Sequence, residues 1–195
     1  MRRLGTLTRE QAIEYNLRDD GKAVSIFLAT QYGRVMSARG IIETILQELG
    51  RPAVIWELGC SAGDISGHFS ENNEVHAVDV VPYAVELAKE RYPAMDVQVS
   101  AAEDVTPQPC DILVLCEFLE HVEEPIKLWM DWAPLAKYVV VGHPLVGDGW
   151  DSEHGHLWAY DEGDFKRWFP MAGLNLRDSF QFPMGYTMIL GWGSR

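Results

Sequence analysis

Three groups of residues in this sequence have types and spacings that suit ligand binding or catalysis. The first lies in residues 55–69, IWELGCSAGDISGHF, where an apolar run ends in Glu57 and two glycines, Gly59 and Gly63, stand four positions apart. A predicted helix follows them. A glycine turn between a strand and a helix lets the backbone come close to a bound ligand. The acids near this turn indicate which ligand it accepts.

These acids favour a ligand with an amine and a ribose. A dinucleotide turn reads G-x-G-x-x-G, and its middle glycine makes room for a pyrophosphate. Here that glycine is absent, and the carboxylate of Glu57 would repel a pyrophosphate but attract an ammonium group. Asp79 is the next-to-last residue of the run EVHAVDV and stands twenty positions after Gly59, where an acid accepts the hydroxyls of a ribose. An amino-acid end and a ribose together describe S-adenosylmethionine.

Each of these assignments has a structural alternative. Gly63 could serve only to relieve steric crowding in the turn. Asp79 could cap the helix predicted to begin near Pro82. The cysteines Cys60 and Cys116 have no basic neighbour in sequence, so we expect them to be small apolar core residues.

The second and third groups are rich in acids and histidines. In CEFLEHVEEP, Glu117, Glu120 and His121 stand at i, i+3 and i+4, so they would share one face if the segment is helical. The later segment GHPLVGDGWDSEHGHLWAYDEGDF contains His154 and His156. Carboxylates and imidazoles are ligands for a divalent ion that lowers the pKa of an acceptor hydroxyl. Alternatively, His121 is a general base, or a hydrogen-bonded structural histidine.

An alternating α/β pattern must position these residues. The short apolar runs AVIW, EVHAVDV, MDVQV, DILVLC and YVVVG alternate with the helical segments AGDISGHF, PYAVELAKERY and PIKLWMDWAPL. Such alternation predicts parallel strands with crossover helices. The segment DEGDFKRWFPMAG predicts a further helix, and LNLRDSFQF and YTMILGWG predict a terminal hairpin. Helical signals also fill residues 1–50, which we interpret as a flank or lid.

Length and composition limit the class of protein. The 195 residues, 47% of them hydrophobic, predict a single domain over 1–195, with the core in 51–195. A formal net charge of −13 argues against nucleic acid as a partner. Three cysteines without metal-finger spacing, and no apolar run of signal or membrane length, predict a cytoplasmic protein without a membrane partner.

Four segments, in order, resemble the motifs of class I S-adenosylmethionine-dependent methyltransferases. They are VIWELGCSAG, VHAVDVVPYAVELAKERYP, VQVSAAEDV and CDILVLCEFLEHVEEP, within residues 50–145. The resemblance is to the small-molecule group typified by ubiquinone-biosynthesis and nodulation-type enzymes. It implies an α/β fold, a Rossmann-like doubly wound seven-stranded sheet with an antiparallel C-terminal hairpin and N-terminal helices.

The resemblance also implies a cofactor site. Glu57 and the backbone of Gly59 would hold the methionine end, Asp79 the ribose, and residues 102–104 the adenine. Cys116 with Glu117 would lie by the reactive sulfur. The complete implied set is Glu57, Gly59, Cys60, Ser61, Gly63, Asp79, Val80, Ala102, Glu103, Asp104, Cys116 and Glu117.

The motifs on the side of the methyl acceptor identify the function less specifically than the cofactor motifs do. The E-x-x-E-H run is similar to that of ubiquinone-biosynthesis O-methyltransferases, and also to the metal-binding run of small-RNA 2′-O-methyltransferases. The latter likeness implies a metal set of Glu117, Glu120, His121 and His156, with His154 as the second choice for the last ligand.

We therefore expect methyl transfer to a small-molecule acceptor, most simply a hydroxyl oxygen, with His121 as the candidate catalytic residue. Metal-dependent 2′-O-methylation of an RNA or nucleoside terminus and a non-catalytic binding module are the alternatives. A nicotinamide oxidoreductase is disfavoured by Glu57 and by the missing middle glycine.

Aromatic and basic residues add three weaker expectations. Phe165, Trp168 and Phe169 recur at helical spacing and should belong to the core. Trp150 and Trp158, in a glycine-rich loop, are candidates for the wall of an acceptor pocket. Tyr32 and Arg34 either fold over the cofactor or lie on an ordinary helix surface.

Overall fold

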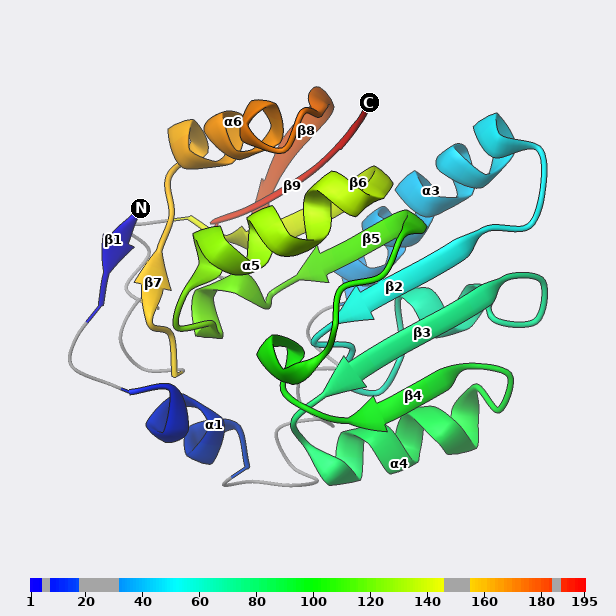
Figure 1. Ribbon diagram of the computed structural model, residues 1–195, viewed down its shortest axis with the longest axis horizontal. Coiled ribbons are helices and arrows are strands. Elements are labelled where there is room, and N and C mark those ends of the chain that lie inside the picture. Colours follow the sequence, from blue (N-terminus) through cyan, green and yellow to red (C-terminus); the bar gives the residue numbers. More distant parts are fainter. Residues whose placement is uncertain (5–7, 18–31, 146–154, 184–186) are drawn as a thin grey trace.

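A seven-stranded sheet forms the centre of the described part of the molecule in the computed structural model (Figure 1). The structure describes residues 1–4, 8–17, 32–145, 155–183 and 187–195. The strand order is β4-β3-β2-β5-β6-β9-β8. The strands are β2 (Val54–Leu58), β3 (Glu74–Asp79), β4 (Asp96–Val99), β5 (Cys110–Cys116), β6 (Ala136–Pro144), β8 (Asn175–Pro183) and β9 (Thr187–Ser194).

The direction of the strands follows the expected pattern. Strands β4, β3, β2, β5 and β6 run parallel, whereas β9 is antiparallel to β6 and β8 is antiparallel to β9. The central strand β5 is buried at all its positions, because parallel strands between two helical layers are covered on both faces. The α/β class, the doubly wound Rossmann-like order and the antiparallel C-terminal pair are thereby confirmed.

Helices cover both faces of the sheet. The α-helices are α1 (Arg9–Leu17), α3 (Tyr32–Leu49), α4 (Pro82–Arg91), α5 (Pro125–Trp132) and α6 (Glu162–Met171). Helices α3 and α4 bury residues such as Ile42 and Val85 on one face. On the other face, α5 and α6 bury Trp129, Trp168 and Phe169, so the aromatic residues of α6 belong to the core as expected.

A short 3-10 turn replaces one of the expected helices. The 3-10 turns are η1 (Ser66–Phe69), η2 (Ala102–Asp104), η3 (Leu119–His121) and η4 (Ala133–Leu135). The predicted helix over AGDISGHF is therefore only η1. Glycine lowers helix propensity, and Gly67 lies so close to Tyr92 that an added Cβ would stand 2.6 Å from its ring. Tight packing thus takes the place of a regular helix here.

The N-terminal residues form contacts that the sequence did not predict. Strand β1 (Arg2–Arg3) pairs with β7 (Trp158–Ala159) in a small antiparallel sheet. Figure 1 shows α1 on the side toward which the arrowheads of β2–β5 point, so this helix lies beyond the carboxyl ends of those strands. Among the described helices, none combines the length and apolar character needed to span a bilayer.

Candidate active site

The candidate site lies at the carboxyl ends of β2, β3 and β5. From β2 the chain proceeds to β3 and β4 on one side, whereas β5 pairs with the opposite edge of β2. Crossovers therefore diverge between β2 and β5, and in open parallel sheets ligands bind at such a switch point. Asp79 and Cys116 are the last residues of β3 and β5, and Glu57 is the next-to-last residue of β2.

The glycine turn after β2 has a backbone that side chains rarely allow. The φ angles of Gly59, Ser61 and Gly63 are +75°, +48° and +76°. A Cβ at Gly59 would also stand 2.6 Å from the ring of Phe118. At Gly63 it would meet Tyr92, the residue after α4, at 3.1 Å, which agrees with the steric alternative for this glycine. The turn is consequently tight and rigidly placed against its neighbours.

Glu57 is a buried carboxyl beneath this turn. Its side chain is 2% exposed, and its Oε2 accepts hydrogen bonds from the backbone N–H of Ser66, at 3.1 Å, and from the Ser66 hydroxyl. Burial raises the pKa of Glu57 to about 7, although the Ser66 hydrogen bonds and the charge of Arg34 oppose this shift. The carboxyl is therefore close to half-ionised at neutral pH, and a bound ammonium group would favour its ionised form.

Asp79 connects the glycine turn to the start of α4. Its Oδ2 accepts from the Ser61 N–H at 2.7 Å, and its Oδ1 accepts from the Val81 N–H at 2.9 Å. Burial raises its pKa while these backbone hydrogen bonds lower it. A carboxylate has about four lone-pair sites, so these two bonds leave acceptor capacity for ribose hydroxyls. Support of the helix start and ribose binding are thus compatible at this residue.

Turn η2 carries the residues expected around the adenine. Ala102 is buried in the core, whereas Glu103 and Asp104 face outward. Both acids form ion pairs with Arg9 of α1: Arg9 Nε lies 3.3 Å from Glu103 Oε1 and Arg9 Nη2 lies 3.2 Å from Asp104 Oδ2. Sequence reasoning missed Arg9, because a partner 94 residues away leaves no local signal.

At the end of β5, a buried arginine faces several acids. Arg34 of α3 is 2% exposed, and its Nη1 lies 3.6 Å from Oε2 of Glu117. The charge of Arg34 also lowers the pKa of both Glu57 and Glu120. Arg34 therefore faces the acids near the end of β5 and does not lie on an exposed helix surface. Cys116 is buried, and burial raises the pKa of its thiol to about 12, in keeping with its expected role as a core residue.

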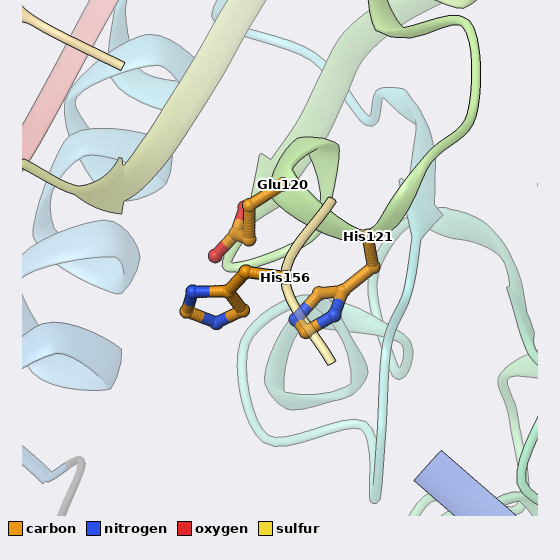
Figure 2. A group of neighbouring side chains, drawn as sticks. All are labelled: Glu120, His121 and His156. Atoms are coloured by element: carbon orange, nitrogen blue, oxygen red, sulfur yellow. The ribbon is translucent and has the colours of Figure 1, made fainter. Parts of the chain in front are cut away.

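Glu120, His121 and His156 converge beyond β5 (Figure 2). Each offers one ligand-type atom, and these atoms lie within 4.8 Å of one another. The rings of His121 and His156 stand edge to face with centroids 4.8 Å apart. Glu120 is 1% exposed, and burial raises its pKa to about 8 against the opposing influence of nearby backbone N–H groups and Arg34. The structure thus brings together three of the four residues expected to bind a metal.

The E-x-x-E-H segment is not the helix that the spacing suggested. It contains only the turn η3, and Glu117 has a φ of +52° immediately after β5. The N–H of Glu117 still donates to Gly142 O at 2.8 Å, as a continuation of the β5–β6 pairing. Glu117 therefore lies against Arg34, apart from the Glu120, His121 and His156 group, and the expected shared helix face does not form.

Some expectations fall on other parts of the chain. His154 and Trp150 lie outside the described residues. Trp158 donates its indole N–H to Val122 O at 2.8 Å and lies under the guanidinium of Arg3. These contacts fix the position of Trp158 but do not test its expected place in an acceptor pocket.

Comparison with known proteins gives a matching domain model and a fold. Residues 56–137 match the model of a family described as a methyltransferase domain. No curated protein gives a significant match to the sequence.

The fold is similar to several solved structures. They include magnesium protoporphyrin IX methyltransferase from Synechocystis with bound S-adenosylmethionine (12% identity, 98% of this chain, 100% of that chain, TM-score 0.73). A second is 1,6-didemethyltoxoflavin-N1-methyltransferase from Burkholderia thailandensis (17% identity, 98% and 92%, TM-score 0.69). A third is the plantazolicin methyltransferase BpumL (13% identity, 96% and 94%, TM-score 0.74).

The family match covers β2 to the start of β6, which includes the glycine turn, Asp79, η2 and the end of β5. The sheet order and terminal antiparallel pair agree with the solved structures over nearly the whole length of both chains. Residues 56–137 thus match a methyltransferase domain, and the described chain has the fold of solved S-adenosylmethionine-dependent methyltransferases.

Proposed function

We propose that this enzyme transfers the methyl group of S-adenosylmethionine to a hydroxyl oxygen of a small molecule. The observation that carries the proposal is the convergence of Glu120, His121 and His156 beyond the end of β5. Methyl transfer is an in-line displacement, and a hydroxyl acceptor must lose its proton as the new bond forms. Groups that accept a proton or bind a cation are required for a hydroxyl acceptor.

The cofactor residues are assigned on their positions around the switch point. Glu57 would accept the ammonium group of the methionine end, and Asp79 would accept the ribose hydroxyls. The turn from Gly59 to Gly63, with Cys60 and Ser61, would border the same end, and Val80 and residues 102–104 would border the adenine. Cys116 and Glu117 would place the end of β5 near the sulfonium.

Two means of activating the hydroxyl fit the residues present. In the first, His121 acts as general base and removes the acceptor proton. In the second, a divalent ion held by the histidines and Glu120 lowers the pKa of the hydroxyl. Both place the acceptor next to η3, between the end of β5 and the Gly155–Leu157 segment.

The size and charge of the acceptor are inferred from two further observations. A net charge of −13 disfavours a polynucleotide. The solved structures of similar fold include enzymes named for a porphyrin, for didemethyltoxoflavin and for plantazolicin. These names support a small acceptor.

A transfer assay tests the proposal. S-adenosylmethionine with a labelled methyl group is incubated with the enzyme and with separate pools of phenols and alcohols, of amines, of carboxylic acids, and of nucleosides and short RNA. We expect label in the first pool, in products that resist alkaline hydrolysis as ethers do and esters do not. Transfer confined to amines, carboxylic acids or RNA would overturn the hydroxyl assignment.

A further inference from the structure

The carboxyl group of Glu120 is buried, and nearby backbone N–H groups and the charge of Arg34 offset the cost of that burial only in part. Neither of its oxygens has a hydrogen-bond partner of good geometry among the described residues, and the side chain is 1% exposed. Burial of an unpaired carboxylate costs several kcal/mol, and even the neutral acid keeps an unsatisfied O–H. A cation at this position would remove both penalties.

The neighbouring ring of His121 is oriented for metal binding. Its Nδ1 lies 3.2 Å from the backbone oxygen of Gly155. A carbonyl oxygen only accepts, so Nδ1 carries the proton and Nε2 of the neutral ring carries the lone pair. Metal-binding histidines commonly have their second nitrogen held in this way, which fixes the tautomer and the direction of the ring.

Backbone hydrogen bonds on both sides of His156 hold this third residue in place. The N–H of Leu157 donates to Glu120 O at 2.7 Å, next to the contact between His121 and Gly155 O. These two hydrogen bonds connect η3 to residues 155–157 on both sides of His156, which is 9% exposed. In Figure 2, His156 and Glu120 point toward each other from these two segments. The group is therefore pre-formed and not a chance cluster on a flexible surface.

We infer that Glu120, His121 and His156 bind one divalent transition-metal ion, and that Glu117 is not a ligand. Two imidazoles and one carboxylate suit zinc, manganese, iron or cobalt better than magnesium or calcium, which prefer oxygen ligands. Three protein ligands leave coordination positions open for an acceptor hydroxyl, as catalytic ions require. Glu117 is excluded because its carboxylate faces Arg34 instead. The catalytic part of this inference rests on the proposed hydroxyl acceptor, but ion binding does not.

Calorimetric titration of protein stripped of metal by chelator tests the site without an acceptor. Zn²⁺, Mn²⁺, Co²⁺ and Mg²⁺ are added separately to the parent and to the variants Glu120→Gln, His156→Gln and Glu117→Gln. We expect one ion per chain in the parent, tighter binding of the transition metals than of Mg²⁺, and a rise in melting temperature with ion concentration. Co²⁺ should also give visible absorption bands that report its coordination.

The variants locate the ion. Glu120→Gln and His156→Gln should weaken binding at least tenfold, whereas Glu117→Gln should stay within about twofold of the parent. Without metal, Glu120→Gln should melt no lower than the parent, because a neutral amide replaces a buried acid of similar shape. A flat response of the parent to all four ions would overturn the inference, as would equal binding by parent and Glu120→Gln.

Methylation assays with and without chelator distinguish a failure of the metal site from a failure of the proposed function. If ions bind as expected but no hydroxyl compound is methylated, the site stands and the proposed acceptor is wrong. If a hydroxyl compound is methylated by chelator-treated enzyme that binds no ion, the proposed function stands, His121 acts as a base without metal, and the metal site is wrong.

Discussion

Cofactor affinity should depend on pH through the buried carboxyl of Glu57. Its pKa in the free protein is about 7, so below that pH the carboxyl must lose a proton before it can pair with an ammonium group. One pH unit corresponds to about 1.4 kcal/mol, so affinity for S-adenosylhomocysteine should fall about tenfold per unit below pH 7. At alkaline pH the α-amino group of the ligand loses its own proton. Affinity should therefore be greatest above pH 7 and below the pH at which this amine titrates.

The variant Glu57→Gln isolates this effect. A glutamine oxygen can still accept the hydrogen bonds from Ser66, so the turn should keep its structure. Loss of a charge-assisted hydrogen bond worth about 1.5–3 kcal/mol should weaken binding roughly 10- to 150-fold at pH 7.5. The decline below pH 7 should also disappear, because the group that titrates is gone.

Stability supplies a second readout for the same group. The folded pKa of Glu57 lies above its ordinary value of 4.5, so its contribution to stability is present below pH 4.5 and is lost as pH rises through 7. Calorimetric titration from pH 5.5 to 9 measures the change in ligand affinity, and denaturant unfolding over the same range measures the change in stability. Glu71→Gln, at an exposed loop position, is the matched control. If Glu57→Gln keeps the parent's loss of affinity below pH 7, Glu57 does not pair with the ammonium group.

Three further predictions concern other residues. Asp79→Asn should weaken S-adenosylhomocysteine binding at least tenfold by calorimetry, because ribose hydroxyls and the Ser61 N–H lose a charged acceptor; unchanged affinity in a folded variant would remove the ribose assignment. Arg9→Gln should speed ligand dissociation up to about fivefold in stopped-flow, since an exposed ion pair contributes at most about 1 kcal/mol. High salt should accelerate ligand dissociation from the parent similarly, and a dissociation rate independent of salt would show that the ion pairs of Arg9 do not slow it. His143 is buried with its pKa lowered to about 4, so stability should fall by about 3 kcal/mol as pH drops from 6.5 toward 4. Urea unfolding should show this fall in the parent but not in His143→Gln, and equal falls would exclude His143 as the cause.

The fold was largely predictable from local sequence patterns. Continuous apolar runs such as residues 110–116 predicted buried parallel strands, and the C-terminal helix and hairpin appeared where turn residues separate them. The glycine turn was also predictable, because Gly59 and Gly63 both need a positive φ. These features depend on residues close together in the chain.

The acceptor side of the site was less predictable because distant contacts decide it. Helical spacing suggested that Glu117 joins Glu120 and His121. Instead, the N–H of Glu117 donates to Gly142 O and so extends the pairing of β5 with β6 by one residue, and the positive φ of Glu117 then turns the chain away from a regular strand or helix. The partner of Glu117 is then Arg34, more than eighty residues earlier. Likewise, the ion pairs of Arg9 close a gap of over ninety residues, for which a single sequence carries no signal.

Calorimetric titration with S-adenosylhomocysteine, beside NAD and buffer, tests the central assignment most directly. We predict one S-adenosylhomocysteine bound per chain, no heat with NAD, and binding weakened by Asp79→Asn and Glu57→Gln but unaffected by Glu71→Gln. NAD binding without S-adenosylhomocysteine binding, or binding that neither site variant weakens, would contradict a cofactor site at the ends of β2 and β3.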